Sequence, residues 1–162
     1  MPERIATNRL ALTLEADGAS TELAFDATDA IVGGWTGRDR EKLEAHIAEL
    51  AEMGVARPAT TPCFYRVGVN LLTIAEDVQV IGSASSGEVE FLLLNHDGDY
   101  LIGLASDHTD RAVEAYNVTI SKQCCMKPMA RTVWRHADVR DHWDALVLRS
   151  FRTDGGQRLL YQ

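Results

Sequence analysis

Three tight-turn signals, each lying between two extended segments, limit the folds that this 162-residue chain can adopt. The signals are Asp17-Gly18, Asp97-Gly98 and Gly155-Gly156. Such pairs accept the positive φ angles of hairpin turns, because glycine has no Cβ and aspartate tolerates the left-handed region. The segments around the first signal, residues 9–14 and 21–25, read as its two strands, and residues 9–14 alternate between apolar and polar side chains. The sequence therefore predicts a β-rich fold built on antiparallel hairpins.

One segment departs from this pattern and predicts the main helix, at residues 38–53. Leu43, Ile47 and Leu50 recur at i, i+4 and i+7, so they form one apolar stripe along a helix. Asp39 is a suitable start signal. Because strands dominate and do not alternate regularly with helices, the prediction is an α+β, β-rich domain rather than a chain of βαβ units.

Composition narrows the class of protein further. With 46% hydrophobic residues, the chain is long enough for one domain with its own core, spanning residues 1–162. The formal net charge of −8 disfavours nucleic acid and anionic membranes as partners. Two of the three cysteines are adjacent, which suits free thiols in a reducing compartment better than a disulfide framework. We therefore expect a cytoplasmic protein.

A pair of glutamates at the start of a predicted strand is the first candidate site. Glu88 and Glu90 are two residues apart, so their side chains share one face of the strand. Like charges this close raise each other's pKa unless a cation lies between them, and a hard divalent ion takes oxygen ligands of this kind. Asp107 follows the partner strand and can supply a third oxygen. The alternative is that the glutamates face solvent on an edge strand.

Further candidates lie on either side of this segment. His46 and Glu49 are neighbours on the predicted helix, and a carboxylate that holds one imidazole nitrogen leaves the other free as a general base. Lys122 can bind a substrate carboxylate or stabilise an enolate. The alternatives are an ordinary surface pair and a solvated lysine. The adjacent Cys124 and Cys125 offer a nucleophile or a soft-metal ligand, although packing is the favoured interpretation.

Several short motifs, taken in order, resemble the fumarylacetoacetate hydrolase superfamily. The segment 87–90 is similar to its Glu-x-Glu metal motif, and 106–111 to the segment with its later metal-binding aspartate. The segment 120–123 resembles the one that bears its active-site lysine. The segments 31–35 and 46–50 resemble the strand, glycine turn and His-x-x-Glu helix of smaller members. The amino-acid sequences of residues 106–111, 120–127 and 141–144 are most similar to an uncharacterised bacterial branch of that superfamily.

This resemblance implies a mixed β-sandwich roll in which an N-terminal hairpin region, residues 1–30, precedes a catalytic region, residues 31–162. It implies Mg²⁺ or Mn²⁺ held by the three carboxylates, a His-Glu pair that activates water or moves a proton, and a lysine that holds the substrate. The implied activity is C–C bond hydrolysis, decarboxylation, or hydration and dehydration of small keto- or enol-acids. The implied assembly is a homodimer.

The chain also departs from that pattern. The spacing from Glu90 to Asp107 is shorter than in typical members, and the later Gly-Thr loop that helps to close the site is missing. These departures predict a chain truncated at its C-terminus, and weak activity unless a partner chain completes the pocket. They also keep a second hypothesis open, a non-catalytic remnant that binds a ligand or serves in assembly.

Overall fold

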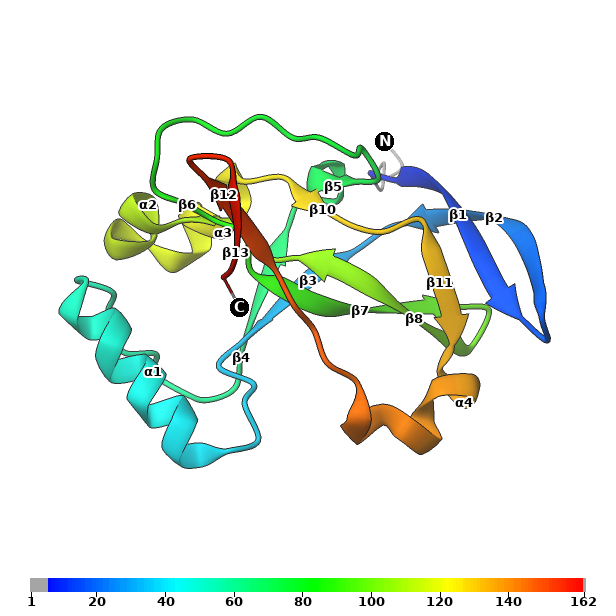
Figure 1. The fold of residues 1–162 in the computed structure, drawn as a ribbon, viewed down its shortest axis with the longest axis horizontal. Helices are drawn as coiled ribbons and strands as arrows, with labels where there is room; N and C mark the ends of the chain where they lie inside the picture. Colours follow the sequence, from blue (N-terminus) through cyan, green and yellow to red (C-terminus); the bar gives the residue numbers. More distant parts are fainter. Residues whose placement is uncertain (1–5, 162) are drawn as a thin grey trace, which may run out of the picture.

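The computed structural model describes residues 6–161 and is organised around a five-stranded mixed sheet (Figure 1). The strand order is β2-β1-β11-β8-β7, and β1 runs parallel to β11 whereas the other neighbours are antiparallel. The strands are β1 (Asn8–Ala16), β2 (Ala19–Ala27), β7 (Val89–His96), β8 (Asp99–Ser106) and β11 (Thr132–Arg135).

Two of the predicted turns close the hairpins of this sheet. Asp17 and Gly18 have φ angles of 54° and 75°, and Asp97 and Gly98 have φ angles of 51° and 89°. Both residues of each turn therefore lie in the left-handed region that two-residue hairpins require. The turns set the registers, so β1 pairs with β2 along its full length and β7 pairs with β8 from Val89 opposite Ser106.

The main hydrophobic core lies against this sheet and draws on all five of its strands. Leu12 in β1 and Val133 in β11 are 2% and 0% exposed. Leu10, Ala27, Leu94, Leu101 and Met129 complete the buried cluster. The N-terminal hairpin is thus part of the core, and the side-chain amide of Asn8 ties it to the body by donating to the carbonyls of Val69 and Leu72.

Smaller paired strands extend the body on the other side of the core. A second cluster buries Ala30, Val67, Val69 and Leu71. The paired elements are β3 (Ala30–Gly34) with β4 (Cys63–Val67), β5 (Leu72–Thr73) with β10 (Lys127–Pro128), and β6 (Ser85–Ser86) with β9 (Thr109–Asp110), and the 3-10 helix η1 (Val69–Leu71) follows β4.

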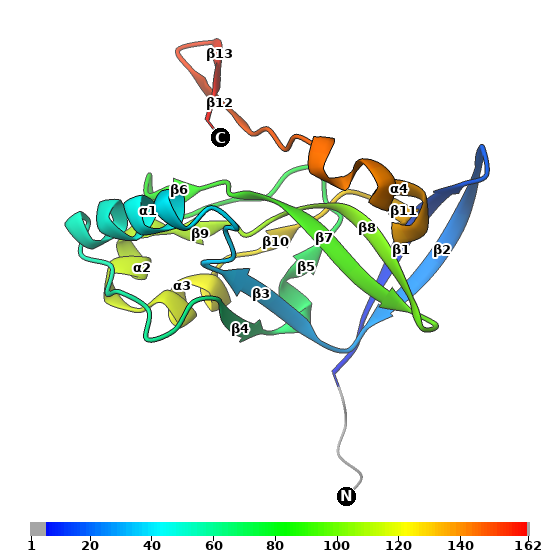
Figure 2. The ribbon, with the colours of Figure 1, turned by 90° about the horizontal axis from the view of Figure 1, so that it is seen from below.

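The main helix, α1 (Arg40–Glu52), projects beside the body rather than covering the sheet (Figures 1 and 2). The Asp39 carboxylate caps it by accepting hydrogen bonds from the backbone amides of Glu41 and Lys42. Within the helix only Ile47 and Leu50 are buried. The predicted helix is confirmed, starting two residues later than residue 38 because Asp39 is the cap.

The remaining helices are short: α2 (Arg111–Tyr116), α3 (Val118–Cys124), α4 (His136–Val139) and the 3-10 helix η2 (Arg140–Ala145). The sequence did not predict α3, which places Lys122 on a helix. Residues 78–81 contain Val78, Val80 and Ile81, a composition that predicts a strand, but they form none, and Val80 and Ile81 are exposed.

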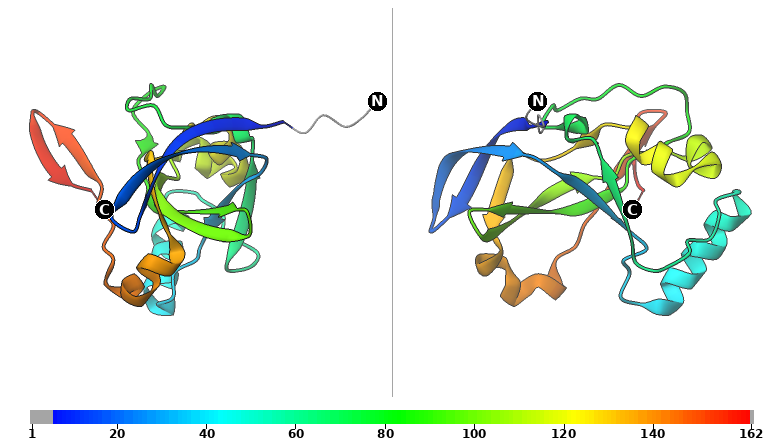
Figure 3. Two further views of the ribbon diagram at one scale, coloured as in Figure 1. Left: turned by 90° about the vertical axis from the view of Figure 1, so that its right-hand side faces the viewer. Right: turned by 180° about the vertical axis from the view of Figure 1, so that it is seen from behind.

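The C-terminal hairpin of β12 (Phe151–Asp154) and β13 (Gln157–Leu160) stands away from the body (Figures 2 and 3). All of its strand residues are exposed. The Tyr161 hydroxyl, 2.7 Å from Ser86 Oγ, joins its end to the body. The third predicted turn is therefore confirmed, and so is the α+β, β-rich class. Within residues 6–161, no helix combines the length and apolar content that crossing a bilayer requires.

Candidate functional site

A pocket of about 420 Å³ lies between α1 and the ends of β7, β8, α2 and α3. Five of the six predicted site residues line it, namely His46, Glu88, Glu90, Asp107 and Lys122. The sixth, Glu49, is not among its lining residues. Other charged or aromatic side chains of the wall are Trp35, Arg38, Asp39, Lys42, Arg111 and Glu114.

The hairpin of β7 and β8 brings the three predicted carboxylates together. Val89 pairs with Ser106, and the backbone amide of Asp107 donates to the carbonyl of Glu88 over 2.8 Å. Asp107 therefore lies across from Glu88 where the hairpin ends. Glu90 lines the same pocket, as the two-residue period of a strand requires.

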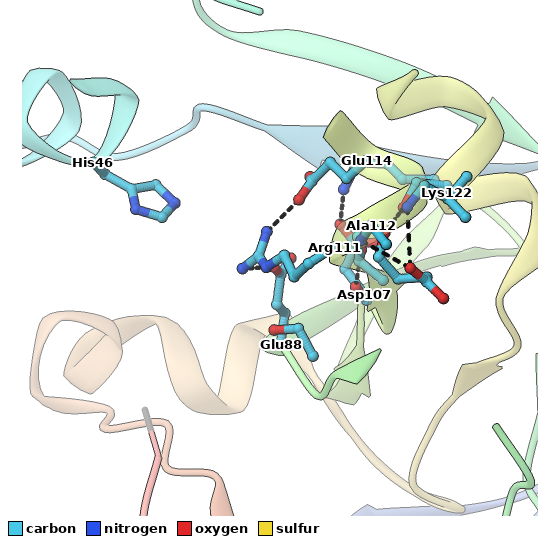
Figure 4. Close-up of polar contacts among 12 residues, drawn as sticks. His46, Glu88, Asp107, Arg111, Ala112, Glu114 and Lys122 are labelled. Atoms are coloured by element: carbon cyan, nitrogen blue, oxygen red, sulfur yellow. Dashed lines mark hydrogen bonds and ion pairs between the residues drawn. The ribbon is translucent and has the colours of Figure 1, made fainter. Parts of the chain in front are cut away.

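Asp107 lies between two buried lysines. Lys122 Nζ forms an ion pair with Asp107 Oδ2, and both side chains are about 5% exposed (Figure 4). Lys127 Nζ lies 3.3 Å from Asp107 Oδ1 without hydrogen-bond geometry, and it donates to the His108 carbonyl over 2.6 Å. The ring of Tyr65 faces Lys122 Nζ with its centroid 5.5 Å away. The Asp107 carboxylate therefore has two cationic partners. Burial lowers the pKa of Lys127 below its ordinary value.

Arg111 joins two further carboxylates. Its guanidinium forms ion pairs with Glu88 and Glu114, and Glu114 is only 4% exposed (Figure 4). Arg111 is the first residue of α2, whose cap is the Asp110 carboxylate. Burial raises the pKa of Glu88 above its ordinary value, while Arg111 and Lys122 act in the opposite direction. Through Glu88, Arg111 thus links the open end of the β7–β8 hairpin to α2.

Glu90 differs from the other acidic groups of the pocket. Its carboxylate has no ion pair or hydrogen bond with any residue from 6 to 161, and burial raises its pKa to about 7, with the charges of Asp107 and Glu88 adding to the shift. The half-buried Arg111 and the buried Lys122 and Lys127 already match the charges of three acidic side chains, Glu88, Asp107 and Glu114. The cluster is therefore balanced when Glu90 is protonated and carries one excess negative charge when Glu90 ionises.

His46 reaches the pocket from α1, and its ring points toward the charge cluster (Figure 4). Its Nδ1 lies 3.5 Å from Glu49 Oε2, but the two side chains are 50% and 70% exposed. The ring centroid of Trp35 is 5.9 Å from that of His46. The predicted pair of His46 and Glu49 therefore lies at the surface with a long contact of 3.5 Å. Of the two residues, only His46 lines the pocket.

Sequence reasoning missed Trp35, Tyr65, Arg111 and Glu114. Trp35 has a φ angle of 60°, an uncommon value for a bulky residue, and its Nε1 lies 3.4 Å from the Tyr65 hydroxyl. Glu114 follows Arg111 by three residues, and this spacing, which favours an ion pair on a helix, was an available signal. Nothing in the sequence marked the two aromatic residues, because a tertiary contact between β3 and β4 brings them together.

The acidic side chains of the pocket do not form a metal site. Across residues 6–161, no group of three or more His, Cys, Asp or Glu side chains is arranged to hold a metal ion. The reason is that Lys122 and Lys127 engage Asp107, and Arg111 engages Glu88. Two carboxylate groups nevertheless keep oxygens without a hydrogen bond to residues 6–161, namely Asp107 through its buried Oδ1, which has only the ion pair with Lys127, and Glu90.

The fold and the site together define an α+β protein with a buried, nearly balanced charge cluster at the floor of a pocket. A family model described as "Protein of unknown function (DUF2848)" matches residues 33–162, and the chain belongs to this family. That match corrects the assignment to the fumarylacetoacetate hydrolase superfamily, to which nothing links the chain. The assignment depended on short motifs that are each common. No curated protein and no solved structure matches the chain.

Proposed function

We propose that the protein is an enzyme of the hydrolase or lyase type that acts on a small keto- or enol-acid, with Glu90 as its acid–base group. The observation that carries this proposal is the unmatched Glu90 carboxylate, whose pKa is raised to about 7. A group that transfers protons at neutral pH works best when its pKa lies near the operating pH. Perturbed carboxyl groups in pockets are common at active sites.

The charges around the pocket support an anionic substrate. Arg38 and Lys42 line its wall from the α1 side, and their side chains are 78% and 87% exposed. They can meet a substrate carboxylate, while Lys122 supplies positive charge on the inner side. A volume of about 420 Å³ suits a small molecule.

Each of the reactions considered develops negative charge on a substrate oxygen. Hydrolysis of a C–C bond, decarboxylation and dehydration of such acids pass through an enolate or a similar anion. Ionised Glu90 removes a proton from substrate or water, and protonated Glu90 returns one. Lys122 stabilises the anion, and His46 on α1 is placed to act as a second proton carrier.

In a second version of this proposal, the enzyme uses a divalent ion, Mg²⁺ or Mn²⁺. It is favoured by two groups of one pocket, the Asp107 carboxylate, whose Oδ1 has no hydrogen bond, and the Glu90 carboxylate, which has no ion pair with residues 6–161. Glu88, Glu90 and Asp107 would hold the ion after Asp107 or Glu88 loosened its ion pairs. When bound, such an ion supplies Lewis acidity toward a carbonyl or carboxylate oxygen.

The experiment measures decarboxylation or hydrolysis of simple β-keto acids such as oxaloacetate across pH, with and without Mg²⁺ or Mn²⁺. Glu90→Gln should lower turnover by about 100-fold or more and remove the ionisation near neutral pH from the profile. His46→Ala should lower turnover without changing that ionisation. Glu22→Gln, an exposed substitution of the same kind on β2, is the matched control.

Two outcomes would reject the catalytic proposal. The first is a Glu90→Gln variant with wild-type turnover and an unchanged pH profile. The second is saturable binding of keto-acids, followed by calorimetry, with no turnover by the wild-type protein at any pH. That second result would support the alternative, a protein that binds a ligand without catalysis.

The assembly that we propose for this enzyme is a homodimer. Phe91 and Leu93 on β7 are about half exposed, and on the C-terminal hairpin Phe151 is 45% and Leu160 64% exposed. A two-fold contact between copies can bury both apolar surfaces at once. Light scattering should therefore give twice the chain mass of 17.9 kDa.

A further inference from the structure

Two adjacent thiols lie at the end of α3, outside the pocket. Cys124 is the last residue of the helix and is exposed, whereas Cys125 is extended and 8% exposed. Their sulfur atoms are 4.0 Å apart, and Cys124 Sγ also donates to the Ser121 carbonyl over 3.3 Å. The two side chains therefore already point toward each other rather than to opposite sides of the chain.

We propose that Cys124 and Cys125 form a vicinal dithiol modification site that a peroxide oxidises reversibly to a disulfide. The exposed Cys124 thiolate attacks a peroxide oxygen, the O–O bond breaks, and a sulfenic acid and hydroxide form. The Cys125 thiol then attacks the Cys124 sulfur, the S–O bond breaks, and the disulfide and water form. Overall the thiols lose two electrons and two protons, and the peroxide is reduced to two waters.

The geometry of neighbouring residues makes this disulfide reversible. Consecutive Cα atoms are about 3.8 Å apart, whereas ordinary disulfides join Cα atoms about 4.4–6.8 Å apart. A bond between adjacent cysteines is therefore strained, and strained disulfides are the easily reduced ones that serve in regulation. Because the two cysteines are adjacent, their disulfide would link no distant segments, so it does not serve to stabilise the fold.

Oxidation at this position acts on the pocket through α3. Lys122 lies two residues before Cys124 on the same helix and pairs with Asp107. The Ser121 hydroxyl donates to the Asp110 carbonyl, and the Gln123 side chain accepts from the amide of Gly68 over 2.9 Å. Closing the disulfide distorts the last turn of α3, so it shifts Lys122 against Asp107. This effect on activity rests on the proposed function, but the thiol chemistry does not.

The chemical test uses the full chain with hydrogen peroxide as the oxidant. Mass spectrometry of the digested protein should show that the peptide containing residues 124 and 125 loses two hydrogens, and that dithiothreitol restores them. Phenylarsine oxide, which bridges paired thiols, should bind the reduced protein at one equivalent and block the oxidation. Cys124→Ser and Cys125→Ser should each abolish both results, and Cys63→Ser, at the separate free thiol, should change neither.

The outcomes separate this inference from the proposed function. Oxidation of Cys124 to sulfinic acid, or disulfides only between chains on a non-reducing gel, would overturn the modification site. Turnover of β-keto acids should fall on oxidation and recover on reduction, and equal turnover of both forms would overturn the link to Lys122. If the internal disulfide forms but no keto-acid is turned over, the modification site stands and only the proposed function fails.

Discussion

At the scale of individual residues, the environment of Glu90 raises the pKa of its carboxyl group far above the ordinary value. Its pKa is about 7 in the folded protein and about 4.3 in an unfolded chain. The folded state therefore binds more protons between these values, so the stability contributed by protonated Glu90 is complete below about pH 4.3 and is lost as the pH rises through about 7.

Glu90→Gln should accordingly stabilise the protein at alkaline pH. Because Glu90 is only partly buried, solvent screening reduces the effect, and we expect a gain of about 1–2 kcal/mol at pH 8 and little change at pH 5. Urea denaturation at the two pH values measures it, with Glu22→Gln as the control. An equal gain at both pH values would show that ionisation of Glu90 is not the cause.

Asp107 should matter more to stability than either of its lysine partners. Asp107→Asn leaves Lys122 and Lys127 as facing buried cations, and breaking such a buried pair costs about 3–5 kcal/mol. Lys122→Met leaves Asp107 paired with Lys127, so its cost should fall to about 1–3 kcal/mol. Denaturant unfolding of the two variants gives the order, and the reverse order would contradict the arrangement of these charges.

The positions of the candidate carboxylates could be predicted because they depend on local rules. Strand alternation places Glu88 and Glu90 on one face, and the turn at Asp97-Gly98 brings Asp107 opposite Glu88. Their cation partners depend on the way that α2 and β10 return to this hairpin, which no local pattern encodes. For that reason the pairing of Arg111 with Glu88 and of Lys127 with Asp107 could not be assigned, and a metal ion was the simplest counter-charge to expect.

Among the elements, α1 was the most predictable from the sequence. Its apolar stripe and its Asp39 cap lie within the segment itself, so sequence rules suffice for them. By contrast, α3 begins with Val118, Thr119 and Ile120, which are weak helix formers, and the Asn117 side chain starts it by accepting from the Ile120 amide. Residues 78–81, Val-Gln-Val-Ile, pair with no strand among residues 6–161 and therefore form none.

Loss of the cap should loosen α1 selectively. Asp39→Ala removes the acceptor of two backbone amides, at a cost of about 1 kcal/mol to the helix. Amide hydrogen exchange in residues 40–52 should then accelerate by about five-fold, while exchange in β1 and β2 stays unchanged. Asp77→Ala, at an exposed loop position, is the control. Uniform acceleration across the chain would mean that α1 opens only with the whole fold.

For the whole molecule, the family match and the folding unit have different boundaries. The match begins at residue 33, after β1 and β2, yet Leu10 and Leu12 of β1 lie in the main core at 3% and 2% exposure. Hairpin turns could be predicted from the sequence, but the parallel pairing of β1 with β11 could not, because it joins segments far apart in the chain.

A chain limited to residues 33–162 should therefore fail to fold cooperatively. It loses two core leucines and the strand that pairs with β11. We expect no sigmoidal thermal transition by circular dichroism, whereas a chain of residues 1–150, which lacks only the exposed C-terminal hairpin, should keep one. A cooperative transition in the 33–162 chain would show that the N-terminal hairpin is dispensable.

The parallel pairing of β1 with β11 also affects synthesis on the ribosome. Thr13 faces Thr132 in the finished sheet, so β1 is translated long before its partner. At about 5–20 residues per second, the delay is roughly 6–24 s. During that interval the nascent β1–β2 hairpin has an unpaired edge, to which a neighbouring nascent chain on the same polysome can add. Slower codons between these two strands would lengthen that exposure and lower the yield of native protein.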